Sequence, residues 1–160
     1  MLPWRSGLNE DEIVRVKELE KNLKDKYQLR LAVLDQEQLV GWTFGWQDSG
    51  TTFFMGASII LPEYRRKGLY SKLIEKVLEI TNLKGFQTVT SCHIVTNNPV
   101  IIAKLKHGFS ISSLEMDAVH GALVRLSYHH NALLKAAAKF RAGAVGEAKI
   151  KQLLDRSLEQ

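Results

Sequence analysis

The 160-residue sequence has little of several features that mark common protein classes. It holds one cysteine, Cys92, so it cannot form an internal disulfide. Its five histidines have no cysteine partners at zinc-site spacing, which leaves no zinc signature. No run approaches the roughly 18 consecutive apolar residues of a membrane span, and the first seven residues lack the apolar core of a secretory signal. We therefore expect a cytoplasmic protein without disulfides, bound metal or membrane contact.

The composition is that of an ordinary globular domain, with 45% hydrophobic and 24% charged residues. This excludes a disordered, collagen-like or coiled-coil chain. The net charge is +5, and the excess is local. Residues 64–84 carry six basic and two acidic side chains, and residues 129–160 carry six and three. This bias favours an anionic partner without identifying it.

Hydrophobic periodicity and turn residues divide the chain into alternating elements. Helices are predicted at about residues 10–27, 67–83, 97–107 and 131–160, and strands at about 29–34, 38–47, 52–61, 86–95, 109–117 and 122–129. The apolar third strand suggests burial on both faces. The order predicts a mixed α/β fold on one mostly antiparallel sheet, with a helical extension behind it.

The segment that carries chemistry is the junction of residues 59–71 (IILPEYRRKGLYS), where a strand passes through a proline and a basic turn into a helix. The first N–H groups of a helix have no intrahelical partner and lie at the positive end of its dipole, so they can bind a phosphate. Gly68 permits a close approach that a Cβ would block. Arg65, Arg66 and Lys67 add positive charge to the turn, which makes it a candidate anion site.

This junction resembles the acyl-CoA pyrophosphate loop of the GNAT acetyltransferases. Residues 65–70 (RRKGLY) fit the pattern Arg/Gln-x-x-Gly-x-Gly/Ala, except that Tyr70 replaces the final small residue. The preceding LPEY at 61–64 is a usual lead-in, and NNP at 97–99 followed by GF at 108–109 resembles the Asn-(x)10-Gly-Phe segment of the family. We expect the Tyr70 ring to turn outward and leave the phosphates to the backbone.

The resemblance covers about residues 29–129 and implies the GNAT fold, in which the third and fourth strands splay apart and the pantetheine arm lies in the gap like an added strand. Exposed backbone of Ile60 and Leu61 would pair with that arm, and a backbone N–H there could hold the oxyanion. It implies acetyl-CoA, or another acyl-CoA, as co-substrate. The expected cofactor-binding residues are Ile60, Leu61, Arg65, Arg66, Lys67, Gly68, Leu69, Tyr70, Ser71, Asn97 and Lys104.

The chain departs from the family at two catalytic positions. Many members have a tyrosine seven residues after the asparagine, thought to protonate the leaving thiolate, and here that position is Lys104. Lys104 could be a weak thiolate donor, a contact to the 3′-phosphate or a solvated lysine. One subgroup places its glutamate base five residues before the asparagine, and here that position is Cys92. The amine must lose a proton before it attacks, so a base is needed unless the amine arrives with a lowered pKa.

His93 and Tyr128 are the catalytic candidates that we select. His93 would be a suitable base at the mouth of the splayed strands. Strand alternation puts Cys92 and His93 on opposite faces, so if Cys92 occupies the site, His93 points toward a covering helix. Tyr128 lies on the last strand, which borders the acceptor cleft in this family. Cys92 and Glu63 remain weaker alternatives.

Both ends of the chain depart from the minimal family. We divide the chain into a domain at residues 1–130, with its N-terminal strand reduced or absent, and a helical extension at 131–160 that packs on the domain or on a dimer partner. The predicted function is transfer of acetyl from acetyl-CoA to a primary amine on a small molecule or a protein. The alternatives are an acyl-CoA-binding module without turnover and, less favoured, nucleic-acid binding through the basic tail.

Overall fold

The computed structural model describes residues 25–143 and the separate positions 10, 11, 14, 146, 148, 151, 152 and 155. Its centre is one six-stranded sheet with the order β1-β2-β3-β4-β6-β5. The strands are β1 (Gln28–Asp35), β2 (Gln38–Ser49), β3 (Thr52–Ile60), β4 (Thr88–Ile94), β5 (Ser110–Asp117) and β6 (Gly121–His129). The helices are the short 3-10 turn η2 (Pro62–Tyr64), α2 (Leu69–Leu83), α3 (Asn98–Lys106) and α4 (Ala132–Arg141).

The sheet opens between β3 and β4. These two strands are parallel and pair over only three residues each, Thr52–Phe54 with Thr88–Thr90. Beyond that point β3 continues beside β2 as far as Ile60, and β4 continues beside β6 as far as Ile94. The other strand pairs are antiparallel. The middle of the sheet is therefore a wedge-shaped gap with two free strand edges.

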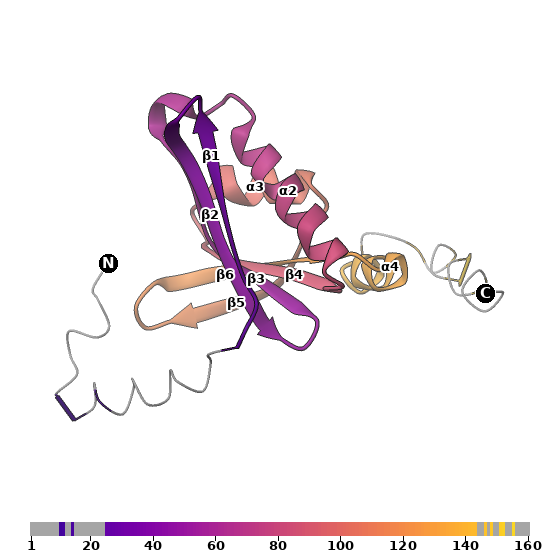
Figure 1. Ribbon diagram of the computed structural model, residues 1–160. Helices are drawn as coiled ribbons and strands as arrows, with labels where there is room; N and C mark the ends of the chain where they lie inside the picture. Colours follow the sequence, from indigo (N-terminus) through magenta and orange to yellow (C-terminus); the bar gives the residue numbers. More distant parts are fainter. Residues whose placement is uncertain are drawn as a thin grey trace.

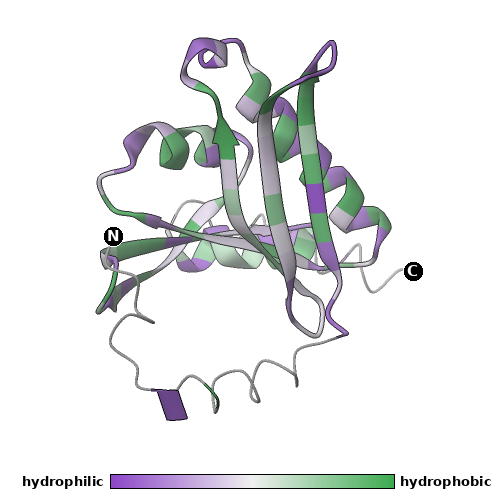
Figure 2. Cartoon of the chain, turned by 60° about the vertical axis from the view of Figure 1, so that its left-hand side comes forward, coloured by the Kyte–Doolittle hydropathy of each residue, from purple (hydrophilic) through white to green (hydrophobic). Residues whose placement is uncertain are grey.

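Helix α2 covers β1 and β3, and α3 lies near the gap, on the side of the sheet shown in Figure 1. Hydrophobic and hydrophilic residues alternate along α2 (Figure 2), as expected for a helix with one buried stripe. That stripe is Leu73, Ile74, Val77 and Thr81. It packs into a core whose centre is Phe53, Val89 and Leu126, each at most 1% exposed. This core fixes α2 and the closed end of the gap.

The predicted mixed α/β fold is confirmed, and most element bounds differ from the prediction by two residues or fewer. The predicted helix end at Tyr27 is wrong, because Asp25 already lies in a turn and Tyr27 lies in no helix. Most of that helix lies outside the described residues. Burial of β3 on both faces is also wrong, since Ile59 is 43% exposed. The strand loses its cover where the sheet splays.

The predicted helix at 131–160 is interrupted at residues 142, 143 and 146, whereas the described positions 148, 151, 152 and 155 are helical. Helix α4 ends at Arg141, and Gly143 follows with a φ of 71°. Glycine adopts this left-handed conformation without a Cβ penalty and commonly ends helices. Most of the predicted helix beyond residue 143 lies outside the described residues. Helix α4 contacts β6, while the domain boundary near residue 130 and a dimer role for this helix stay predictions.

No helix in the described part of the chain is long and apolar enough to cross a membrane.

Candidate active site

The start of α2 has no side-chain cap. Its N-cap residue is Gly68, whose φ of 77° lies in the left-handed region that glycine favours. The first intrahelical bond runs from the Lys72 N–H to the Gly68 carbonyl, at 3.1 Å. The three N–H groups before it, from Leu69 to Ser71, lie in the turn where no intrahelical acceptor exists. A Cβ built on Gly68 would meet nothing within 4 Å, so this corner is open.

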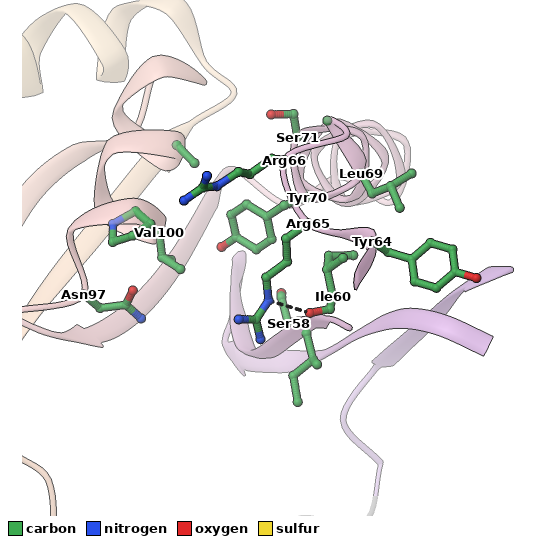
Figure 3. Close-up of a pocket in the computed structure, with 14 residues that line it drawn as sticks. Ser58, Ile60, Tyr64, Arg65, Arg66, Leu69, Tyr70, Ser71, Asn97 and Val100 are labelled. Atoms are coloured by element: carbon green, nitrogen blue, oxygen red, sulfur yellow. Dashed lines mark hydrogen bonds between the residues drawn. The ribbon is translucent and has the colours of Figure 1, made fainter. Parts of the chain in front are cut away.

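A cavity of about 700 Å³ lies in front of this helix start, between β3 and α3. Eight of the eleven predicted cofactor residues line it: Ile60, Arg65, Arg66, Gly68, Leu69, Tyr70, Ser71 and Asn97. Figure 3 shows Asn97 and Val100 on one side and the arginines with the helix start on the other. The structure therefore brings the two sequence motifs, 65–70 and 97–99, to opposite walls of one cavity.

The three basic residues of the turn are placed differently. Arg65 donates from Nε to the Ile60 carbonyl at 3.0 Å, which fastens the turn to the end of β3 (Figure 3). Arg66 has a φ of 61°, a conformation uncommon outside glycine, and it lines the cavity. Lys67 does not line it, and its Nζ lies 4.8 Å from the centre of the Tyr64 ring. Two of the three predicted cations thus lie at the cavity.

The free edge of β3 corrects one backbone prediction. The Leu61 N–H donates to the Val40 carbonyl at 2.9 Å, so it points toward β2 and is not exposed to the gap. Backbone groups alternate in direction along a strand, so those of the neighbouring Ile60 point to the open edge. The Ile60 carbonyl is the one that Arg65 reaches. The prediction that both residues expose backbone to the gap is therefore wrong for the Leu61 N–H.

The expected outward position of Tyr70 is also wrong. Its ring turns into the space between the start of α2 and Val100, whereas the Tyr64 ring points away (Figure 3). Burial raises the pKa of the Tyr70 hydroxyl, which therefore stays protonated at neutral pH. The residue lines both this cavity and a second, inner one. A large side chain fits the position because it occupies the cavity wall and not the path to the helix start.

The inner cavity measures about 210 Å³ and continues from the first. The two share five lining residues: Ser58, Ile59, Tyr70, Asn97 and Val100. At its far end are His93 of β4, Met55 of β3 and Lys104 of α3. Lys104 is 1% exposed, so it is not a solvated lysine. Burial lowers its pKa to about 7, and burial together with the Lys104 charge lowers the pKa of His93 to about 4.

Cys92 and Tyr128 lie elsewhere among the described residues. Cys92 is on the face of β4 opposite His93, where its Sγ is 3.8 Å from Glu115 Oε2. Burial and Glu115 raise its pKa, which keeps it a thiol at neutral pH. Tyr128 packs against Phe109 and the Lys135 ammonium and lines neither cavity. The structure brings His93 to the inner cavity and does not bring Tyr128 there, so a catalytic role for Tyr128 stays a prediction without support from this placement.

Sequence reasoning missed several lining residues. Val100 lies three positions after Asn97, and Ala103 lies three positions after Val100, so each is a helical neighbour of the lining residue before it. Ser58 is two residues before Ile60 and shares its strand edge. Glu63, a weak catalytic alternative, is exposed in η2. The remaining lining residues are Ile59, Tyr64 and Pro99.

Comparison with known families agrees with this geometry. A model described as the acetyltransferase (GNAT) family matches residues 2–109, more than half of the chain. The chain belongs to the GNAT acetyltransferase family. Members of this family are acyltransferases, and the protein is an enzyme of that class. No curated protein matches the chain.

Solved structures of GNAT proteins share the fold. A Bacillus subtilis acetyltransferase in complex with CoA is 14% identical, has a TM-score of 0.62 and aligns over 78% of this chain and 95% of its own. A GNAT acetyltransferase from Elizabethkingia anophelis with acetyl-CoA bound is 9% identical, has a TM-score of 0.61 and aligns over 71% and 82%. An IAA acetyltransferase from Bacillus cereus is 13% identical, with a TM-score of 0.61 over 71% and 83%. At sequence identities this low, the similarity to these structures establishes a shared fold.

Proposed function

We propose that this GNAT protein transfers an acetyl group from acetyl-CoA to a primary amine, by direct attack of the amine on the thioester. The acceptor is a small molecule or a protein amine. The observation that carries the proposal is the uncapped start of α2 at Gly68, which opens onto the larger cavity. Unpaired N–H groups at the positive end of a helix dipole fit a diphosphate, and Arg65 and Arg66 add charge beside it.

The free edge of β3 supports the path of the pantetheine arm. Ser58 and Ile60 of β3 line one side of the larger cavity, and Asn97 and Val100 form the opposite wall. An arm that starts at Gly68 and follows this edge reaches the inner cavity with His93 and Lys104. We infer that the thioester lies at this inner end. The ammonium form of Lys104 can then give a proton to the leaving thiolate, while neutral His93 is a weak base for the attacking amine.

Calorimetric titration with acetyl-CoA tests the cofactor site. Gly68→Asp should weaken affinity by about 100-fold, because a carboxylate beside a diphosphate costs several kcal/mol through like-charge repulsion and crowding. Gly121→Asp is the matched control, since Gly121 also has a positive φ, 76°, and an open Cβ position, but begins β6 in the hairpin turn. Equal affinities in the two variants would contradict the proposed site.

Initial-rate kinetics test direct attack. With a panel of amines, thiol release should give intersecting double-reciprocal lines, because both substrates must be bound before the acetyl group moves. Parallel lines would indicate an acetyl-enzyme and contradict the mechanism. Cys92→Ala should keep the activity, since this thiol lies on the other face of β4.

A second candidate is an acyl-CoA-binding module without turnover. One observation favours it. The position of the usual acid holds the buried Lys104, and the position of the usual base holds Cys92, whose thiol is hydrogen-bonded to Glu115. Tight acetyl-CoA binding with no thiol release across a broad amine panel would support the module against the enzyme.

A further inference from the structure

Lys104 is a buried lysine without an oxygen partner in the described part of the chain. Its Nζ donates to Met55 Sδ at 3.3 Å and lies 4.8 Å from the centre of the Phe109 ring. Thioether sulfur is a weak acceptor, and lysine is almost never fully buried unless a carboxylate pairs with it. The ammonium form of Lys104 is therefore poorly compensated in this site.

Among the described residues no carboxylate contributes to the lowered pKa of Lys104, whose cause is burial. The inner cavity that it lines has two other titratable side chains, His93 from β4 and Tyr70 from α2. Burial lowers the pKa of His93 to about 4 and raises that of Tyr70, so both are neutral at neutral pH. Met55 of β3 and Phe109 carry no charge. With its pKa lowered to about 7, Lys104 is close to half uncharged at pH 7.

The uncharged amine lies where the proposed function puts the thioester. Lys104 is at the inner end of the cavity pair, and the shared walls of Ser58, Asn97 and Val100 lead there from the helix start. At pH 7 such an amine is uncharged about a thousand times more often than a lysine of ordinary pKa. A neutral amine held beside a thioester has a high effective concentration as a nucleophile.

We propose that Lys104 is a self-acetylation site of this protein, modified by bound acetyl-CoA when no acceptor amine is present. The inference rests on the proposed function. The Nζ lone pair forms a bond to the thioester carbonyl carbon, the C–S bond breaks, and the thiolate takes up the proton that Nζ loses. The products are an Nε-acetyl-lysine and CoA. The amide that forms carries no charge, so acetylation removes the cost of burying the ammonium, and its acetyl group occupies the inner cavity.

The test incubates the full chain with acetyl-CoA without acceptor and follows acetylation by intact-mass and peptide-mapping mass spectrometry. We expect one acetyl group at Lys104, with a rate that rises through about pH 7 and then levels off. Lys106, exposed on the same helix, is the internal control and should be modified far more slowly. Excess CoA should block acetylation of Lys104 and leave that of Lys106 unchanged.

The variant Lys104→Met supplies the second arm, because an unbranched apolar side chain suits the contacts with Met55 and Phe109. This variant should fold, bind CoA in calorimetry and gain no acetyl group in the inner cavity. Acetyl-CoA binding without acetylation of Lys104, or equal acetylation of Lys104 and Lys106, would overturn the inference and leave the proposed function intact. Absence of CoA binding to the wild-type chain would overturn both.

Discussion

Two helices in the described part of the chain have an asparagine as N-cap residue, and the two asparagines are used differently. Asn131 caps α4, because its side-chain oxygen accepts the N–H groups of Leu133 and Leu134 at 2.9 and 3.0 Å. Asn97 occupies the same position of α3 but makes no capping bond, and it lines both cavities. One asparagine satisfies its own helix, whereas the other leaves its helix uncapped beside a cavity.

The same contrast extends to the regions around them. At the α4 end the Thr81 hydroxyl donates to the Val77 carbonyl at 2.8 Å and contacts His130 Nε2 at 3.0 Å. At the cleft the start of α2 is uncapped, and Lys104 is buried without a carboxylate partner among the described residues. Unsatisfied polar groups cost stability. Their concentration at the cleft indicates a region shaped for a ligand at the expense of the isolated fold.

The largest effect that sharpens this comparison is expected at Lys104. Lys104→Met should raise the free energy of unfolding by roughly 2 to 4 kcal/mol near pH 6, since it removes a buried ammonium. The folded pKa of about 7 is below the unfolded value, so between pH 7 and about 10 the unfolded state binds more protons and wild-type stability rises with pH. The gap between variant and wild type should therefore shrink over that window. Urea denaturation at several pH values measures it, and parallel pH profiles would contradict the assignment.

Binding of CoA should offset the stability that the unpaired polar groups at the cleft cost the free protein. CoA at 100 times its dissociation constant should stabilise the fold by about 2.7 kcal/mol, through selective binding to the folded state. Thermal melts should show the shift in the wild type and in Gly121→Asp, and little of it in Gly68→Asp. A shift of the same size in all three would break the contrast between the two regions.

The two asparagines provide a matched pair. Asn131→Ala should cost about 1 kcal/mol of stability, as loss of an N-cap typically does, and leave CoA affinity unchanged. Asn97→Ala should cost less stability, because its side chain caps nothing, and should weaken CoA binding several-fold. Denaturation and CoA calorimetry on both variants check this. A larger loss of CoA affinity in Asn131→Ala than in Asn97→Ala would contradict the assigned roles.

The smallest effect is expected at two buried threonines. Thr90→Val should be neutral or stabilise by up to about 1 kcal/mol, since it removes a hydroxyl that has no partner among the described residues. Thr81→Val should destabilise by about 1 kcal/mol, because it leaves His130 without its hydroxyl partner. Denaturation midpoints of the two variants and the wild type give the sign of each stability change. A loss of stability in Thr90→Val would show that the Thr90 hydroxyl has a hydrogen-bond partner in solution.

Local patterns in the sequence were sufficient for the strand-turn-helix junction. Pro62 ends a strand, Gly68 supplies a left-handed turn, and the apolar spacing of α2 begins directly after it. These signals depend on residues that are neighbours in the chain, so they can be read without knowledge of the tertiary structure. The motif at 65–70 and the asparagine at 97 then predicted the two walls of the cavity.

The placements of Tyr70 and Lys104 could not be predicted from the sequence, because tertiary packing decides them. Tyr70 lies four and seven positions before the buried Ile74 and Val77, so helical spacing did carry a signal for an inward ring. For Lys104 the sequence left a thiolate donor, a phosphate contact and a solvated lysine open, because nothing local reports that Met55 and Phe109 cover it. The Leu61 N–H depended on strand register with Val40, which is also a property of the folded sheet.

The short seam between β3 and β4 has a consequence for how this enzyme could diverge. Three residue pairs join the two halves of the sheet, and Phe53 and Val89 within the seam are almost fully buried. The opening angle of the wedge is thus determined by packing at its vertex, away from the residues that line the cavities. Substitutions at the vertex would change the width of the whole wedge at once and leave the start of α2 at Gly68 untouched.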